Sequence, residues 1–171
     1  TAIFENSTST APLLLHIKPL PDENKPVSFS GATGRFTITS VVVNSSLAKN
    51  EQGFLEITLL GKGNFTQLDA PVLHWPEGVE GFEPTVSDEL EKIKIPLAGR
   101  RTFRFPFVCA APGLYKFLPV SFTYFDTDSN TYKTIHSGSP EVRVSNNEKI
   151  TPKKETVKPT FAAQNERAAR I

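Results

Sequence analysis

The single cysteine and the three histidines are the first residues that could carry catalysis. Cys109 could act as a nucleophile with one of these bases, which are His16, His74 and His136. Cys109 follows three Phe residues at alternating positions, however, and this pattern favours a buried thiol with a raised pKa. The histidines lie on separate segments without the spacing of a zinc site. The sequence therefore predicts a structural cysteine and no metal centre.

The acidic run after residue 125 resembles the opening of a calcium-binding loop. Asp126, Asp128 and Asn130 have the right spacing, but the sixth and twelfth positions of such a loop hold Thr131 and Ser137. A calcium loop needs glycine at the first of these positions and a bidentate glutamate at the second. The run is better interpreted as the polar tip of a β-hairpin.

A second acidic group follows the only tryptophan, in a predicted loop over residues 76–84. The loop contains Glu77, Glu80 and Glu83, and it is flanked by Trp75 and includes Phe82. Carboxylates beside an aromatic ring occur in sugar-processing sites, but loop carboxylates are usually solvated. We interpret these five residues as a contact loop for a partner protein, with the aromatic residues as anchors. The alternative is that Trp75 and Phe82 cap one end of the fold.

Nothing in the sequence combines a nucleophile, a base and an oxyanion site, so no enzyme and no cofactor are expected. The glycines at 31–34 and 61–63 lack the ending of a phosphate-binding loop and do not lead into a helix, which predicts turns. The net charge of +1 gives no reason to expect a nucleic-acid partner. No apolar run reaches the length of a membrane span, so any membrane attachment would lie in a segment outside this chain.

The elements that must position these residues are predicted to be short strands. Fourteen prolines and ten glycines punctuate the chain and disfavour long helices. Alternating apolar residues predict strands at 13–18, 34–43, 53–60, 101–109, 114–118, 120–124, 132–135 and 141–144. Pro106 has no amide hydrogen, so the strand at 101–109 should lie at a sheet edge or contain a bulge.

The pattern predicts an all-β fold, an immunoglobulin-like or fibronectin-III-like β-sandwich. Gly113 and Tyr115 resemble the tyrosine corner of such sandwiches, in which the tyrosine hydroxyl bonds to the backbone upstream. We expect a linker at 1–11, the sandwich domain at 12–147 and a basic tail at 148–171. This tail would be extended or partly helical, with a short helix at 161–171 if something packs on it.

Several strings, taken in order, resemble one known family. They are LHIKPLP at 15–21, FSGATGRF at 29–36, GKGNF at 61–65, DAP at 69–71, WP at 75–76, FEP at 82–84, GRRTF at 99–103, FTYFD at 122–126 and YKT at 132–134. This order is similar to that of the BatD family, the bacterial oxygen-tolerance or aerotolerance proteins, particularly those of Bacteroidetes. The match runs from about residue 13 to residue 144.

The resemblance implies a role that the residue patterns alone do not show. BatD-like proteins are membrane-anchored, with immunoglobulin-like domains on the periplasmic side of the inner membrane. They are encoded beside MoxR-type ATPases and proteins with von Willebrand A domains. The chain would then be a non-catalytic protein-interaction domain in an envelope complex linked to oxygen or stress tolerance. Its partners would be a von Willebrand A domain or other envelope proteins of the same operon, with the three glutamates as contacts.

Two alternatives belong to other functional classes. The domain could be a carbohydrate-binding module of a cell-surface protein, although most aromatic residues occupy inward positions. It could also be a spacer that holds other domains apart.

Overall fold

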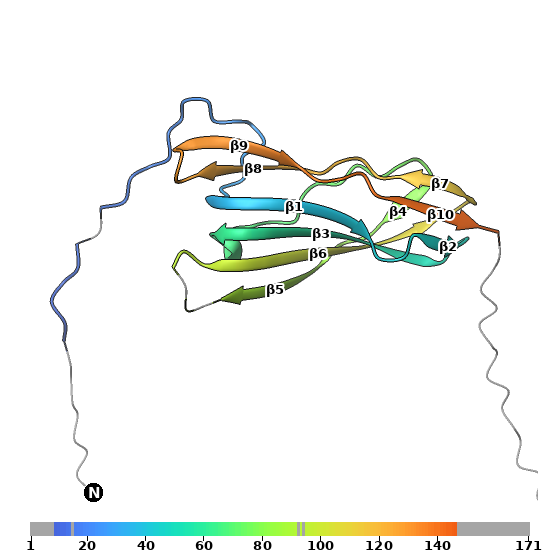
Figure 1. Ribbon diagram of the computed structural model, residues 1–171, viewed down its shortest axis with the longest axis horizontal. Helices are drawn as coiled ribbons and strands as arrows, with labels where there is room; N and C mark the ends of the chain where they lie inside the picture. Colours follow the sequence, from blue (N-terminus) through green and yellow to red (C-terminus); the bar gives the residue numbers. More distant parts are fainter. Residues whose placement is uncertain (1–8, 15, 92, 94, 147–171) are drawn as a thin grey trace, which may run out of the picture.

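The computed structural model describes residues 9–14, 16–91, 93 and 95–146, and this part of the chain folds almost entirely into β-strands. Two layers of mostly antiparallel strands pack face to face, which confirms the predicted all-β sandwich (Figure 1). The predicted tail at 148–171, with its short helix at 161–171, and most of the linker at 1–11 lie outside the described residues. The described chain enters at one end of the sandwich and leaves after its last strand at the other end (Figure 1).

The first layer is a sheet with three long strands and a divided edge. Its order is β1 (Gly34–Val42), β3 (Gln52–Gly63) and β6 (Ala98–Cys109), all antiparallel. The far side of β6 then pairs with β4 (Val79–Gly81) and, further along, with β5 (Thr85–Glu91). Apolar residues alternate along the long strands, so one face of the sheet is buried and the other is exposed.

The second layer is built from two smaller sheets. The hairpin of β8 (Ser121–Asp126) and β9 (Thr131–His136) covers one half of the first sheet (Figure 1). The other half faces β7 (Gly113–Lys116), β10 (Glu141–Ser145) and the short β2 (Ser46–Ala48). Because β7 leads into β8 and β9 leads into β10, the two small sheets are consecutive parts of one layer.

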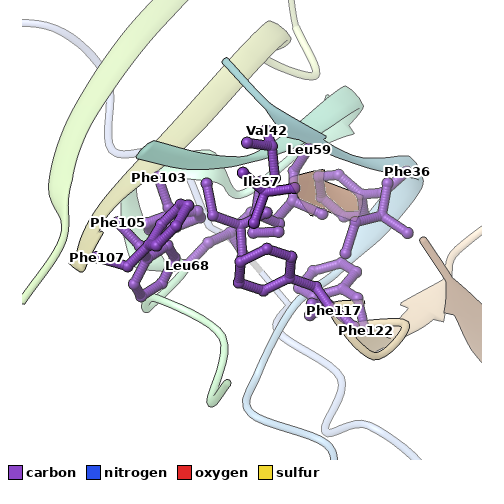
Figure 2. Close-up of a cluster of buried hydrophobic side chains, with 14 of the residues drawn as sticks. Phe36, Val42, Ile57, Leu59, Leu68, Phe103, Phe105, Phe107, Phe117 and Phe122 are labelled. Carbon is purple, nitrogen blue, oxygen red and sulfur yellow. The ribbon is translucent and has the colours of Figure 1, made fainter. Parts of the chain in front are cut away.

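The core between the layers is rich in phenylalanine. Figure 2 shows side chains of β3 and β6, such as Ile57 and Phe103, meeting Phe117 and Phe122 of the second layer. Phe36 makes edge-to-face contacts with Phe122 and two other rings at centroid distances of 5.3 to 5.6 Å. Cys109 lies in the same cluster, and burial raises the pKa of its thiol. The predicted structural role of this cysteine is confirmed.

Pro106 lies at a bulge, as one of its two predicted placements requires. Strand β6 has neighbours on both sides, so the edge placement is wrong. Gly81 is opposite Phe107, whereas Thr85 is opposite Arg104, so three residues of the edge strand face two residues of β6. The Phe82 amide donates to the Pro106 carbonyl at 2.9 Å. The bulge therefore occurs where β6 has no amide hydrogen to offer.

Two other predictions are wrong. Residues 13–18 form no strand among the described residues, and Leu13 and Ile17 are 82% and 91% exposed. An alternating pattern makes a strand only beside another strand, and none lies next to this segment. The predicted loop at 76–84 contains β4, and the pattern search missed β5 altogether. Strand β5 has no buried residue, so its sequence has no need to alternate between apolar and polar residues.

The segment over residues 20–32 covers the outer face of β8 and β9, and we call it the covering segment (Figure 1). Phe29 lies edge to face with Tyr132 at 4.9 Å, and the Tyr132 hydroxyl donates to the Pro21 carbonyl at 2.7 Å. The hydroxyls of Ser28 and Thr123 are 2.9 Å apart. As a result, β8 is buried on both faces.

Candidate interaction surface

Trp75, the first residue of the predicted contact loop, packs as part of the core. Its ring lies 6.3, 6.1 and 5.9 Å from those of Phe105, Phe107 and Phe117. A Cβ added to Gly81 would lie only 2.0 Å from the indole, so the indole occupies the space that a side chain at position 81 would need. This placement matches the end-capping alternative for Trp75.

Phe82 lies on the opposite face of the sheet from Trp75. Val79 and Gly81 face inward with their β6 neighbours Cys109 and Phe107, so the residues between and after them face outward. The Phe82 side chain is 46% exposed, a large value for a phenylalanine. The structure therefore separates the two aromatic residues that the sequence grouped together.

Phe82 ends a row of apolar side chains across the outer face of the first sheet. The Val43 amide donates to Phe54 at 3.0 Å, Phe54 is opposite Pro106, and Pro106 accepts the Phe82 amide. Val41 and Val108 flank this row on β1 and β6. We call these residues the apolar band: Val41, Val43, Phe54, Phe82, Pro106 and Val108.

Most of the band is not visible in the sequence, because its members come from four separate segments that only strand pairing brings together. One signal was available. Phe54 is out of phase with the buried Leu55, Ile57 and Leu59, so it had to lie on the exposed face of its strand. Elsewhere that face is mostly polar, as the paired hydroxyls of Thr58 and Thr102 illustrate.

The three predicted glutamates lie in β4 and on either side of it, in the same segment as Phe82. Glu80 lies on β4 opposite Val108, Glu77 lies in the turn before β4, and Glu83 lies in the bulge after Phe82. All three are exposed. We call them the acidic rim.

A cation lies over the middle of the band. The Arg104 guanidinium is 4.0 Å from the centroid of the Phe54 ring and 3.7 Å from the Glu56 carboxylate. The exposed side of the Phe54 ring is therefore occupied by a cation–π contact. Of the two aromatic residues of the band, Phe82 is therefore the one whose exposed ring could insert into a pocket of a partner protein.

Tyr115 makes the bond that the tyrosine-corner prediction requires. Its hydroxyl donates to the Ala111 carbonyl at 2.8 Å, and Gly113 begins the same strand. The ring lies against Gly78, whose added Cβ would be 3.4 Å from the hydroxyl oxygen. The Gly78 carbonyl in turn accepts the Ala110 amide at 3.1 Å. The corner therefore supports the turn that carries Glu77.

The glycine-rich strings at 30–34 and 61–64 form one structural unit at the other end of the sandwich. The Asn64 side chain accepts the Thr33 amide at 2.7 Å and donates to the Gly31 carbonyl at 2.9 Å. Gly34 and Gly63 pair so closely that a Cβ on Gly34 would lie 2.0 Å from a backbone oxygen. Gly31 lies in a bend, as predicted, but Gly34 begins β1 and Gly61 and Gly63 belong to the end of β3, so the turn predicted at 61–63 is wrong.

The polar tip of the β8–β9 hairpin is held together by its own residues. Asp126 accepts the amides of Asp128 and Ser129, and the Lys133 ammonium donates to the same carboxyl group. The hydrogen bond from Lys133 holds the pKa of Asp126 below its ordinary value. The tip is the hairpin turn predicted from the sequence.

Two further features bear on chemistry. An open groove of about 420 Å³ lies between residues 69–75 and 117–123, and its titratable lining residues are Asp69 and His74. Within the described ranges, no group of three or more His, Cys, Asp or Glu residues could hold a metal ion. The helices of this part of the chain include none long and apolar enough to cross a membrane.

Comparisons with known proteins give a fold likeness only. No family model matches the chain, and no curated protein matches it. A solved structure with a similar fold is the non-cellulosomal cohesin from the hyperthermophilic archaeon Archaeoglobus fulgidus, at 12% sequence identity and a TM-score of 0.34. The match covers 63% of this chain and 91% of the cohesin chain.

Proposed function

We propose that this domain is a protein-interaction module and that the apolar band with its acidic rim is the docking surface. The observation that carries the proposal is the row from Val43 to Phe82, a set of apolar side chains on a mostly polar, exposed sheet face. Apolar patches rimmed by polar residues mark interaction sites. Exposed aromatic residues in such patches commonly contribute most to binding.

The partner should present an apolar pocket for Phe82 and positive charge for the rim. Carboxylates around an anchor accelerate association with a cationic surface and make binding sensitive to salt. A metal-bearing surface would serve the same purpose, and a von Willebrand A domain is the partner of this kind that the BatD resemblance implies. Glu77, Glu80 and Glu83 would then be alternative ligands for its metal.

In the cell, we place this domain on the periplasmic side of the bacterial inner membrane, in a membrane-anchored BatD-like protein of an envelope complex for oxygen or stress tolerance. The ordered strings from residue 15 to residue 134 support this placement. The path of the chain, which enters and leaves at opposite ends of the sandwich, suits a domain connected in series with others (Figure 1).

A carbohydrate-binding role is the second candidate, because Phe54 and Phe82 lie on one flat face. Sugar rings stack on open aromatic faces, and the Phe54 face is covered by Arg104. This contact favours a protein partner over a glycan. A spacer role would leave the band without any partner.

The test is to immobilise the domain, pass solubilised envelopes over it and identify bound proteins. We expect that the wild type and the Leu60→Asp variant retain the same bound proteins and that the Phe82→Asp variant does not retain them. Leu60 is the matched control because it is 54% exposed on the same face, outside the band. Reversing all three rim charges should weaken retention most at low salt. Equal retention by Phe82→Asp and the wild type would refute the proposal, and binding of Phe82-dependent glycans on an array would replace it.

A further inference from the structure

Residues 13–18 have the pattern of a strand but no strand beside them. Leu13 and Ile17 alternate with His16 and Lys18, and both apolar side chains are exposed. The segment runs away from the sandwich before the covering segment begins (Figure 1). Exposed apolar residues at strand spacing indicate a segment that pairs with the edge of another sheet.

Strand β5 is an open edge of the first sheet. The Phe82 amide donates to the Pro106 carbonyl, so the backbone N–H and C=O groups of the even-numbered β6 residues point toward β5. The β5 residues opposite them are odd-numbered, and their backbone groups point toward β6. The backbone groups that point away from the sheet therefore belong to Val86, Asp88 and Leu90. In Figure 1 no ribbon lies beyond β5. The edge thus offers N–H and C=O groups from three residues to an added strand.

The side chains of this edge match those of the unpaired segment. On its inner face β5 carries Val86, which is 53% exposed, and Leu90, with Asp88 between them bound by Arg101. On its outer face it carries Glu89, whose carboxylate is bound by Arg100 and remains 64% exposed. We propose that residues 13–18 of one copy add as a strand to β5 of a second copy. Leu13 and Ile17 would lie beside the apolar inner residues, and Lys18 would lie on the face of Glu89.

The charges favour this pairing over the pairing of two β5 edges. Strand β5 contains three acidic residues and no basic one, so two copies of it would bring like charges side by side. Residues 13–18 contain a lysine and no acidic residue. The edge therefore rejects its own copy and accepts the N-terminal segment.

The experiment measures the mass of the purified chain by sedimentation over a range of concentrations. Ile17→Asp removes the donor, and Val86→Pro removes an outward-pointing amide hydrogen without touching the ladder to β6. We expect the wild type to associate with rising concentration and each variant to stay monomeric. A mixture of the two variants should form one-to-one dimers, because each keeps the half that the other lacks.

Controls separate this inference from folding effects and from the proposed docking surface. Val27→Asp changes an apolar residue that is also fully exposed, so it should associate like the wild type. Val86→Asp is a second acceptor variant that leaves the backbone unchanged. Phe82→Asp should leave self-association intact. A wild type that stays monomeric at every concentration, equal association of Ile17→Asp and Val27→Asp, or a mixture without dimers would overturn the proposal.

Discussion

Strands β8 and β5 occupy similar places in the fold but have opposite environments. Each forms a ladder with one other strand, β9 for β8 and β6 for β5. Five of the six residues of β8 are buried, whereas none of the seven residues of β5 is. The covering segment and the start of β1 seal β8, and the Phe125 amide bonds to the Ala32 carbonyl there at 2.8 Å. Nothing in the described chain seals β5.

The difference shows how this domain separates stability from recognition. Sealing β8 requires apolar or hydrogen-bonding residues at every position, and the sequence Phe-Thr-Tyr-Phe-Asp supplies them. The side with β4 and β5 keeps a polar sequence, and it contains Phe82 and the acidic rim. Substitutions around β8 should therefore change folding, and substitutions around β4 and β5 should change binding.

The largest effect is expected for Phe125→Ala. Phe125 is 4% exposed and lies edge to face with Tyr132 at 5.1 Å, so its removal leaves a cavity under the covering segment. The free energy of unfolding should fall by about 4 kcal/mol. Urea denaturation measures the change. Val86→Ala on β5 is the control and should change the value by less than about 0.5 kcal/mol; equal effects would contradict the comparison.

A smaller loss is expected for Asn64→Ala, which tests how the covering segment is joined to β1. The Asn64 side chain bonds to Gly31 and Thr33, at the point where the two meet. The substitution should lower the free energy of unfolding by about 2 kcal/mol. Asn64→Asp keeps the acceptor and loses the donors, so it should fall between the wild type and Asn64→Ala. If Asn64→Ala has the same free energy of unfolding as the wild type, the junction between the covering segment and β1 does not depend on the Asn64 side chain.

Tyr115→Phe should cost about 1 kcal/mol, because it removes one hydrogen bond to Ala111 and leaves the ring in place. The turn with Glu77 rests on this ring. Hydrogen exchange should therefore rise at Ala110, whose amide bonds to Gly78, more than in the centre of β3. A uniform rise across the domain would argue against a local role for the corner.

A final prediction concerns the dependence of stability on acid pH. Hydrogen bonds from Lys133 and Arg101 lower the pKa of Asp126 in β8 and of Asp88 in β5 below the ordinary value of 3.8. A carboxyl group whose pKa is lower in the folded state than in the unfolded state stabilises the fold at every pH above its ordinary pKa. This stabilisation is lost as the pH falls from the ordinary pKa to the lowered one. Asp126→Asn should therefore flatten the acid limb of a stability-versus-pH curve. An unchanged limb would mean that this carboxyl group does not control acid unfolding.

The parts of the fold that depend on buried alternation were predictable from the sequence. The long strands, the structural Cys109 and the hairpin tip follow from local chemistry. The missing amide hydrogen of Pro106 limited its place to an edge or a bulge, and only the pairing of β6 on both sides decided for the bulge. Strand β5 was not predictable, because a strand exposed on both faces has no apolar period. Residues 13–18 failed for the opposite reason, since their pattern is that of a strand whose partner lies outside this domain.

The candidate site was only half predictable. Phe82 and the three glutamates are neighbours in the sequence, so composition was enough to group them. Val43, Phe54 and Pro106 join them only through the pairing of β1, β3 and β6, which one sequence does not specify. Trp75 was grouped with Phe82 by proximity, although the Trp75 ring packs under Gly81 against the core and Phe82, the next residue after Gly81, faces outward.

The most direct test of the account is site-specific photocrosslinking in cells of the source organism. A photoreactive residue would replace Phe82 in the apolar band or, as the control, Val27 on the covering segment. The account predicts a discrete crosslinked protein at position 82 and none at position 27, with the product lost when the acidic rim is reversed in charge. Equal crosslinking at both positions, or none at position 82, would contradict the claim that the β4–β5 side is the recognition surface.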